Sequence, residues 1–204
     1  MTAGDIAVVT IKREHQALER VLLTLREFLA RIEAGVASPE FDMFCAALYY
    51  LDDFQERCHH PKEEQYIFRS LNAATSEFRE VIDNLHAAHV NSAQAISQLH
   101  HSLVHYQGGA VRGLETFRSN VDAYAARMFE HVHCEEDLFA RSLEVLSEHD
   151  WARIAAAFDE NDDPLFGGNR REAFGRLFQR IHVLTPRKLK QGLYSTSRDV
   201  LRKA

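Results

Sequence analysis

Apolar residues recur every three or four positions along most of the chain, as they do on one buried face of a helix. This recurrence predicts long helices over about residues 6–34, 39–71, 76–106 and 111–146. Gly and Pro lie mainly between these stretches, and Pro39 suits the first turn of the second helix with Ser38 as its N-cap. Long amphipathic helices joined by short loops predict an all-α fold, an antiparallel up-down-up-down four-helix bundle.

The pattern changes after residue 146, where the apolar stretches become shorter. Short helices are expected over about residues 150–158 and 170–183, joined by the turn Asp163–Gly168. The acidic residues of this turn lack the ligand spacing and terminal Glu of an EF-hand, so we interpret it as a connector. The predicted organisation is a bundle domain over residues 1–146 and a helical extension with a basic tail over residues 147–204.

Charge is distributed unevenly along the 204 residues. Residues 1–169 carry a net charge of −14 and residues 170–204 carry +8. An acidic body in the same chain favours docking of the tail on that body over nucleic-acid binding. The chain has no apolar run of about 20 residues and no signal peptide, so we expect a cytoplasmic protein without a membrane anchor. A homo-oligomer is compatible with this pattern.

Histidines are concentrated in the middle of the chain, where nine of the 12 lie between residues 59 and 133. Shifting the sequence by 72 residues aligns 59–71 (HHPKEEQYIFRSL) with 131–143 (HVHCEEDLFARSL), with identity at six of 13 positions. The repeated element pairs a histidine with a glutamate four residues later, which places both side chains on one helix face. Clusters of this type point to metal binding.

On three of the long helices a histidine, in one case with a glutamate, continues the apolar stripe, while the stripe of the second helix points away from His59 and His60. On the first, third and fourth helices these residues are His15, His89 and His131 with Glu135. The second helix offers His59 or His60 with Glu63 or Glu64, and a kink at Pro61 could turn either histidine inward. In an up-down-up-down bundle all of these positions lie near the same end.

A single core-facing histidine is usually a hydrogen-bonded core residue, but several converging ones need a stronger reason. Imidazoles and carboxylates without a cysteine set suit iron or manganese better than structural zinc. A histidine and glutamate at i,i+4 allow the imidazole to hold one ion while the carboxylate bridges two. These considerations predict a non-haem di-iron centre.

With these motifs in place, the chain resembles the hemerythrin-like family, in particular its HHE cation-binding branch. The resemblance covers about residues 10–146 and rests on His15 and on the motifs HHPKEEQYIF (59–68), LHAAH (85–89) and HVHCEEDLF (131–139). It implies a site of two iron ions, with manganese or zinc as possible substitutes. The implied ligands are His15, His59, Glu63, His89, His131 and Glu135.

Other residues remain candidates for the same site. The 72-residue repeat equates His59 with His131 and Glu63 with Glu135, which favours that register over His60 with Glu64. The further candidate ligands are therefore His60, Glu64, His86 and Glu136. A ferritin-like site would use the pairs Glu56–His59 and Glu130–His133, but Glu130 and His133 point away from the apolar face of their helix.

Three functions follow from this pattern. The main hypothesis is a di-iron protein that binds oxygen or nitric oxide, or binds iron, for sensing, carriage or storage. The second is a di-iron enzyme, peroxidase-like or oxidase-like, or one that repairs iron centres. The third is a metal-free helical interaction module in which the charged tail matters most for binding a partner.

Overall fold

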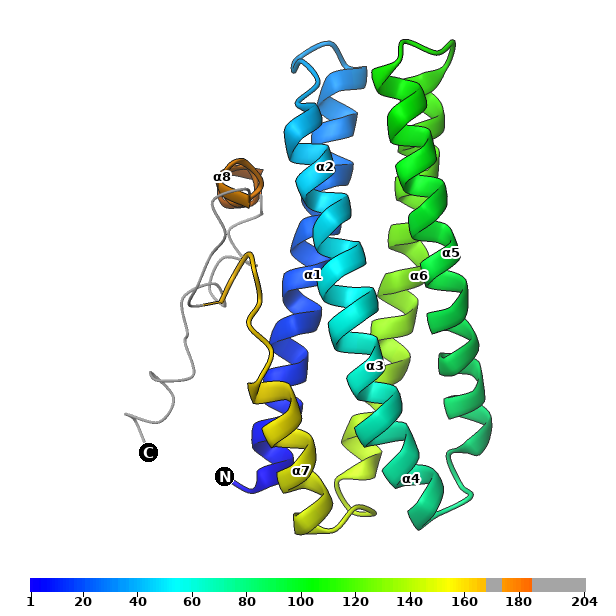
Figure 1. The fold of residues 1–204 in the computed structure, drawn as a ribbon, viewed down its shortest axis with the longest axis vertical. Helices are drawn as coiled ribbons and strands as arrows, with labels where there is room; N and C mark the ends of the chain where they lie inside the picture. The colour runs from blue at the N-terminus through cyan, green and yellow to red at the C-terminus, as the bar shows by residue number, and fades with distance from the viewer. Residues whose placement is uncertain (168–173, 185–204) are drawn as a thin grey trace.

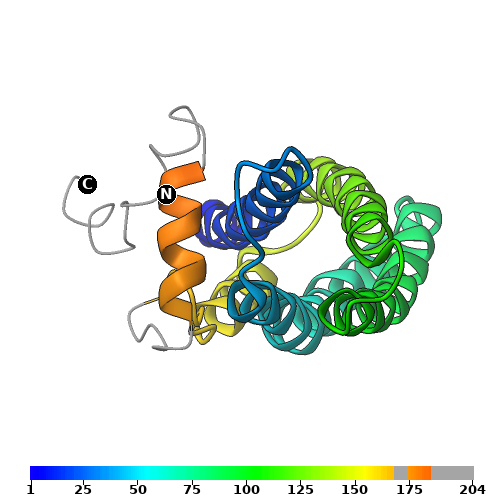
Figure 2. The ribbon, with the colours of Figure 1, turned by 90° about the horizontal axis from the view of Figure 1, so that it is seen from above.

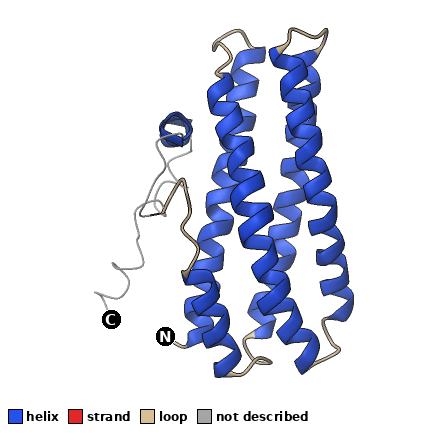
Figure 3. Ribbon diagram, in the orientation of Figure 1, coloured by secondary structure: helices blue, strands red, loops and turns tan. Residues whose placement is uncertain are grey.

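The computed structural model describes residues 1–167 and 174–184, and within these ranges the chain is helical without any strand (Figure 3). The prediction of an all-α fold is therefore confirmed. The long uninterrupted helices are α1 (Ala3–Glu33), α5 (Arg79–Gln107) and α6 (Gly113–Ser142). The segment between α1 and α5 consists of α2 (Phe41–Tyr50), η1 (Leu51–His59), α3 (His60–Lys62), η2 (Glu63–Phe68) and α4 (Arg69–Ala74).

Figure 1 shows α1, the segment from α2 to α4, α5 and α6 side by side, with successive segments running in opposite directions. Seen from above, these segments surround a common interior (Figure 2). Helix α7 (Glu148–Asp159) packs along α1, and α8 (Gly175–Leu184) runs across α1 and α2. Within the described ranges, none of the helices combines the length and apolar character needed to cross a bilayer.

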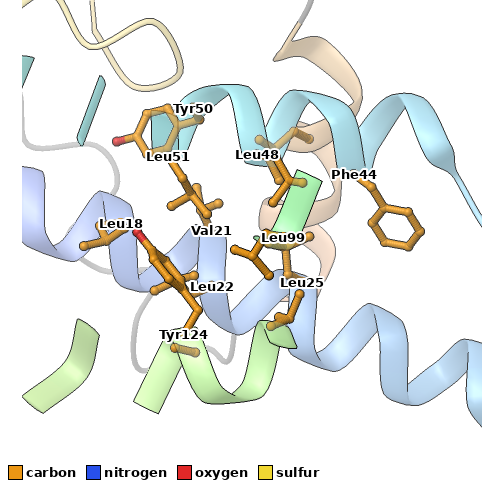
Figure 4. Close-up of a cluster of buried hydrophobic side chains, with 14 of the residues drawn as sticks. Leu18, Val21, Leu22, Leu25, Phe44, Leu48, Tyr50, Leu51, Leu99 and Tyr124 are labelled. Carbon is orange, nitrogen blue, oxygen red and sulfur yellow. The ribbon is translucent and has the colours of Figure 1, made fainter. Parts of the chain in front are cut away.

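The interior consists of two hydrophobic clusters. One includes Leu22, Phe44 and Leu99, and part of it is shown in Figure 4, where side chains of α1 face those of α2, η1, α5 and α6. The other includes Ile11, Phe68 and further buried residues of α5, α6 and α7. Along each long segment, the buried histidines and glutamates lie between the residues of the first cluster and those of the second. The bundle thus has a polar layer between two apolar ones.

The second long segment differs most from its prediction as one helix over residues 39–71. Its first helix begins at Phe41, and the N-cap is Glu40 without a side-chain cap bond, so the prediction of Ser38 as N-cap is wrong. The segments η1 and η2 are π-helical: the backbone N–H of His60 donates to the carbonyl of Gln55, and that of Arg69 to Glu64. Pro61 offers no N–H and crowds the preceding turn, so a regular α-helix is disfavoured at this point.

The C-terminal helices agree broadly with their predicted positions. Helix α7 begins two residues before the predicted start, where Ser147 and Asp150 form a capping box. The start predicted at residue 170 for the last helix lies outside the described residues, as does the basic tail over residues 187–204.

Candidate metal centre

The structure brings the six predicted ligands together inside the bundle, and His60 joins them. All seven side chains are buried: His15 on α1, His59 on η1, His60 on α3, Glu63 on η2, His89 on α5, and His131 and Glu135 on α6. Their ligand atoms form two groups of four, each within a span of 4.8 Å. Glu63 belongs to both groups, so they are adjacent and share a carboxylate.

The first group contains His15, His59, Glu63 and Glu135. The Nε2 atoms of His15 and His59 lie 3.1 Å apart, and Nε2 of His59 lies 3.1 Å from Oε1 of Glu63. Glu135 completes the group from α6, with its Oε2 atom 3.4 Å from Nε2 of His15. The carboxylates of Glu135 on α6 and Glu63 on η2 thus face the imidazoles of His15 on α1 and His59 on η1.

The second group contains His60, Glu63, His89 and His131. The Nε2 atoms of His89 and His131 lie 3.0 Å apart, and Nε2 of His131 lies 3.1 Å from Oε1 of Glu135. The other oxygen of Glu63 lies 3.5 Å from Nε2 of His89. The ring of His60 stacks on that of His89, with centroids 4.0 Å apart. Glu63 and Glu135 therefore each face histidines of both groups.

The π-helical backbone explains how adjacent residues supply both groups. In an α-helix, consecutive side chains diverge by about 100°, which would send His59 and His60 to different faces. A π turn contains more residues, so consecutive side chains diverge less. Here His59 is fully buried and His60 is 3% exposed. His59 and His60 are therefore not alternatives in this structure, because each enters a different group.

Several of the ligand-type histidines also contact a polar side chain on the far side of the ring. Nδ1 of His59 donates to Glu14 at 2.6 Å, and Nδ1 of His89 donates to Glu64 at 2.8 Å. Nδ1 of His15 lies 3.6 Å from Glu136, beyond normal hydrogen-bond length. Such outer partners fix the ring orientation and tautomer of a metal-binding histidine.

The remaining predicted candidates lie outside the two groups. Glu64 and Glu136 contact histidines from behind and are partly exposed. His86 is exposed and donates to Glu64, while His133 is exposed on α6. Glu130 is also exposed. The Glu130–His133 pair of the ferritin-like alternative therefore points away from the interior.

The electrostatics of the site reflect close packing of opposite charges. Burial alone would lower the pKa of His15, but the facing carboxylates of Glu136 and Glu63 raise it to about 9. Burial likewise opposes ionisation of Glu135, yet the imidazoles of His131 and His89 hold its pKa well below the ordinary value. Burial and the neighbouring imidazole of His89 keep the pKa of His60 well below its usual range.

Unpartnered buried atoms test whether these residues fit a metal ion. Neither carboxylate oxygen of Glu63 receives a hydrogen bond from any described residue, and the same holds for Oε2 of Glu135. A buried carboxylate without such partners costs several kcal/mol. Two ligand atoms about 2.1 Å from one ion and at right angles lie about 3 Å apart, close to the observed Nε2–Nε2 distances. The residues present therefore fit bound cations.

A pocket of about 370 Å³ lies between α5 and α6 and reaches His131. Its walls include Leu85, Ala88, Tyr124 and Met128. On the opposite side, the first group is covered by the segment after α6, where the Phe158 ring lies 5.7 Å from that of His59. The two groups thus have different surroundings.

Sequence reasoning missed polar residues around the histidines, chiefly Glu14, Asn161 and Gln55, whose amide lies 3.1 Å from Nε2 of His60. Glu14 directly precedes His15 in the sequence, and this position beside a core-facing histidine is a weak signal that Glu14 lies near the site. Asn161 gives no such signal, since it contacts Glu14 across a separation of 147 residues.

Comparison with curated proteins finds uncharacterized proteins of Mycobacterium bovis and of the CDC 1551 and H37Rv strains of Mycobacterium tuberculosis. Each is 26% identical over 159 residues, which cover 77% of this chain and 61% of the relative. The chain therefore spans about three fifths of the length of these relatives. No solved structure matches the chain.

A family model, the hemerythrin HHE cation-binding domain, matches residues 7–143. This range contains every residue of the two ligand-type groups and ends just before α7. The chain belongs to the hemerythrin HHE cation-binding family.

Proposed function

We propose that this chain is a non-haem di-iron protein, an antiparallel four-helix bundle that binds oxygen or nitric oxide, or holds iron, for sensing, carriage or storage. The observation that carries the proposal is the pair of adjacent four-residue groups that share Glu63. One buried group could be an isolated polar cluster. Two groups that share a carboxylate match what a pair of neighbouring cations requires.

The donor set supports iron over a structural zinc ion. The first group offers two imidazoles and two carboxylates, and the second offers three imidazoles and one. No thiolate takes part, since Cys134 is exposed and Cys58 is half-buried outside both groups. Closed zinc sites favour thiolates, while mixed imidazole and carboxylate sets suit iron, with manganese or zinc as possible substitutes.

Different residues of the chain would hold the two ions. His15, His59 and Glu135 would help hold one ion and His60, His89 and His131 the other, while Glu63, which belongs to both groups, would supply a carboxylate to each. Bound iron would supply open coordination positions and electrons for a diatomic ligand. The apolar clusters on both sides of the polar layer would limit the access of water, and the α5–α6 pocket would give a small molecule a route towards His131.

The same pocket favours a second candidate, a di-iron enzyme of the peroxidase, oxidase or iron-centre repair type. Its volume of about 370 Å³ exceeds what a diatomic molecule needs, and the polar residues Ser92 and Tyr124 are among those that line it. A metal-free interaction module has less support, because it leaves both oxygens of the buried Glu63 carboxylate without a hydrogen-bond donor among the described residues.

Spectroscopy of the loaded protein separates these functions. The metal-free chain is loaded with ferrous iron without oxygen and then exposed to nitric oxide or oxygen while its ultraviolet-visible spectrum is followed. Stable new absorption that reverses when the gas is removed supports binding. Transient absorption followed by turnover of an added reductant supports an enzyme. A spectrum unchanged by both gases contradicts gas binding and the enzyme, and it leaves only the holding of iron.

A further inference from the structure

The segment after α6 lies outside the residues matched by the family, which end at residue 143. It nevertheless covers the first ligand group. Helix α7 packs against α1 and η2, and the amine of Lys62 donates to the backbone carbonyl of Ala157. This segment is therefore in position to act on the site.

Asn161, two residues after the end of α7, makes the most specific of these contacts. Its Nδ2 atom lies 3.0 Å from each carboxylate oxygen of Glu14 and donates to that carboxylate. The other end of the amide is held as well, because the Cys58 thiol donates to Oδ1 of Asn161 at 3.1 Å. The amide orientation is thus fixed by contacts with α1 and η1.

Glu14 in turn contacts His59. Its Oε2 atom accepts from Nδ1 of His59 at 2.6 Å, and the residue is 7% exposed. The opposite ring nitrogen, Nε2, faces His15 and Glu63 within the first group. A carboxylate behind a histidine fixes which ring nitrogen faces the metal and makes that nitrogen a better ligand.

We propose that Asn161 is a positioning residue of the metal centre, which holds Glu14 against His59 and so sets the orientation of His59 in the first group. The inference rests on the proposed function, because it concerns affinity for a cation in that group. Without Asn161, the Glu14 carboxylate loses a donor that reaches both of its oxygens and can turn away from His59. The C-terminal segment then contributes to the site as well as to the fold.

A double-mutant cycle on cation affinity tests this. Wild type, Asn161→Ala, Glu14→Ala and the double variant are titrated with cobalt(II), whose visible absorption reports its ligand set. Asn161→Ala should weaken one of the two binding events about tenfold, and Glu14→Ala by about tenfold or more. Adding Asn161→Ala to Glu14→Ala should cause no further loss, because Asn161 acts through Glu14.

Asn72, exposed on α4, provides the matched control, and Asn72→Ala should leave both binding events unchanged. Asn161→Asp is a second variant, for use if Asn161→Ala folds poorly. Its side chain has the same size and its carboxylate repels Glu14, so it should weaken the same binding event. Thermal unfolding of the metal-free variants records any purely structural effect.

Two results overturn the inference: unchanged cobalt affinity in both Asn161 variants, or losses in the double variant that equal the sum of the single ones. If wild type binds two ions and either result appears, only the role of Asn161 fails. If wild type binds no ion, the proposed function itself fails.

Discussion

At the scale of single residues, Glu63 has the most demanding environment. It is fully buried, it belongs to both ligand-type groups, and neither of its oxygens receives a hydrogen bond from a described residue. Burial and the neighbouring carboxylate of Glu135 would raise its pKa, but the imidazoles of His59 and His15 hold it below the ordinary value. In the absence of metal, protonated imidazoles can therefore balance this carboxylate, and bound cations would replace those protons.

Asp163 allows a pH prediction away from the metal centre. Burial raises the pKa of Asp163 from 3.8 to about 6, even though the amides of Phe166 and Leu165 and the Tyr50 hydroxyl donate to it. A raised pKa means that the folded state favours the protonated form. The stabilising contribution is therefore full below about pH 3.8 and is lost as the pH rises through about 6.

The comparison variant is Asp163→Asn, which has a similar shape and does not titrate. From pH 5 to pH 7, the unfolding free energy of metal-free wild type should fall by about 1 kcal/mol relative to the variant. Urea unfolding of both proteins at each pH measures this difference. A difference that stays constant across this range would show that Asp163 titrates normally.

Some site residues could be predicted from the sequence and others could not. His15, His89, His131 and Glu135 continue the apolar stripe of their helices, so periodicity alone places them inside. Outer partners such as Glu14 and Asn161 depend on contacts between distant segments. Local patterns carry little information about such contacts: the position of Glu14 beside His15 is a weak signal, and Asn161 gives none.

At the scale of elements, the π-helical segments η1 and η2 decide how many histidines the second segment supplies. On a regular α-helix only one of His59 and His60 can face the site. The sequence could indicate only a kink at Pro61. In the structure both histidines are buried, because the helix has i→i−5 hydrogen bonds on both sides of that proline. Periodicity rules assume α-helical geometry, so they fail where the helix changes type.

The α5–α6 pocket leads to a prediction about access. Ala88 lines the pocket, while Ala87, one position earlier, is exposed and lies outside the lining. Ala88→Phe should fill the pocket and slow the association of nitric oxide with the iron-loaded protein by about tenfold, which corresponds to about 1.4 kcal/mol on the barrier. Stopped-flow absorbance measures the rate.

Ala87→Phe is the control, because it adds the same side chain outside the pocket. Both variants should retain the iron content of wild type, which separates access from damage to the site. Equal association rates in the two variants would show that the ligand reaches the iron by another route.

At the scale of the whole molecule, the polar layer lies between two hydrophobic clusters and has two different sides. The segment after α6 covers the first group through Phe158 and Asn161, while the second group borders the α5–α6 pocket at His131. The all-α fold followed from the sequence, because long amphipathic stretches have few other ways to bury their apolar faces. The division of the site into a covered side and an accessible side depends on how distant segments dock.

The central claim is that the two groups hold two iron ions through a shared Glu63. It is tested most directly by titrating metal-free protein with ferrous iron in the absence of oxygen and counting the ions bound per chain. Wild type and the control Glu80→Gln, which changes an exposed glutamate in the first turn of α5, should bind two ions, while Glu63→Gln should lose tight binding of both. No tight iron binding by wild type, or two ions still tightly bound by Glu63→Gln, would contradict the claim.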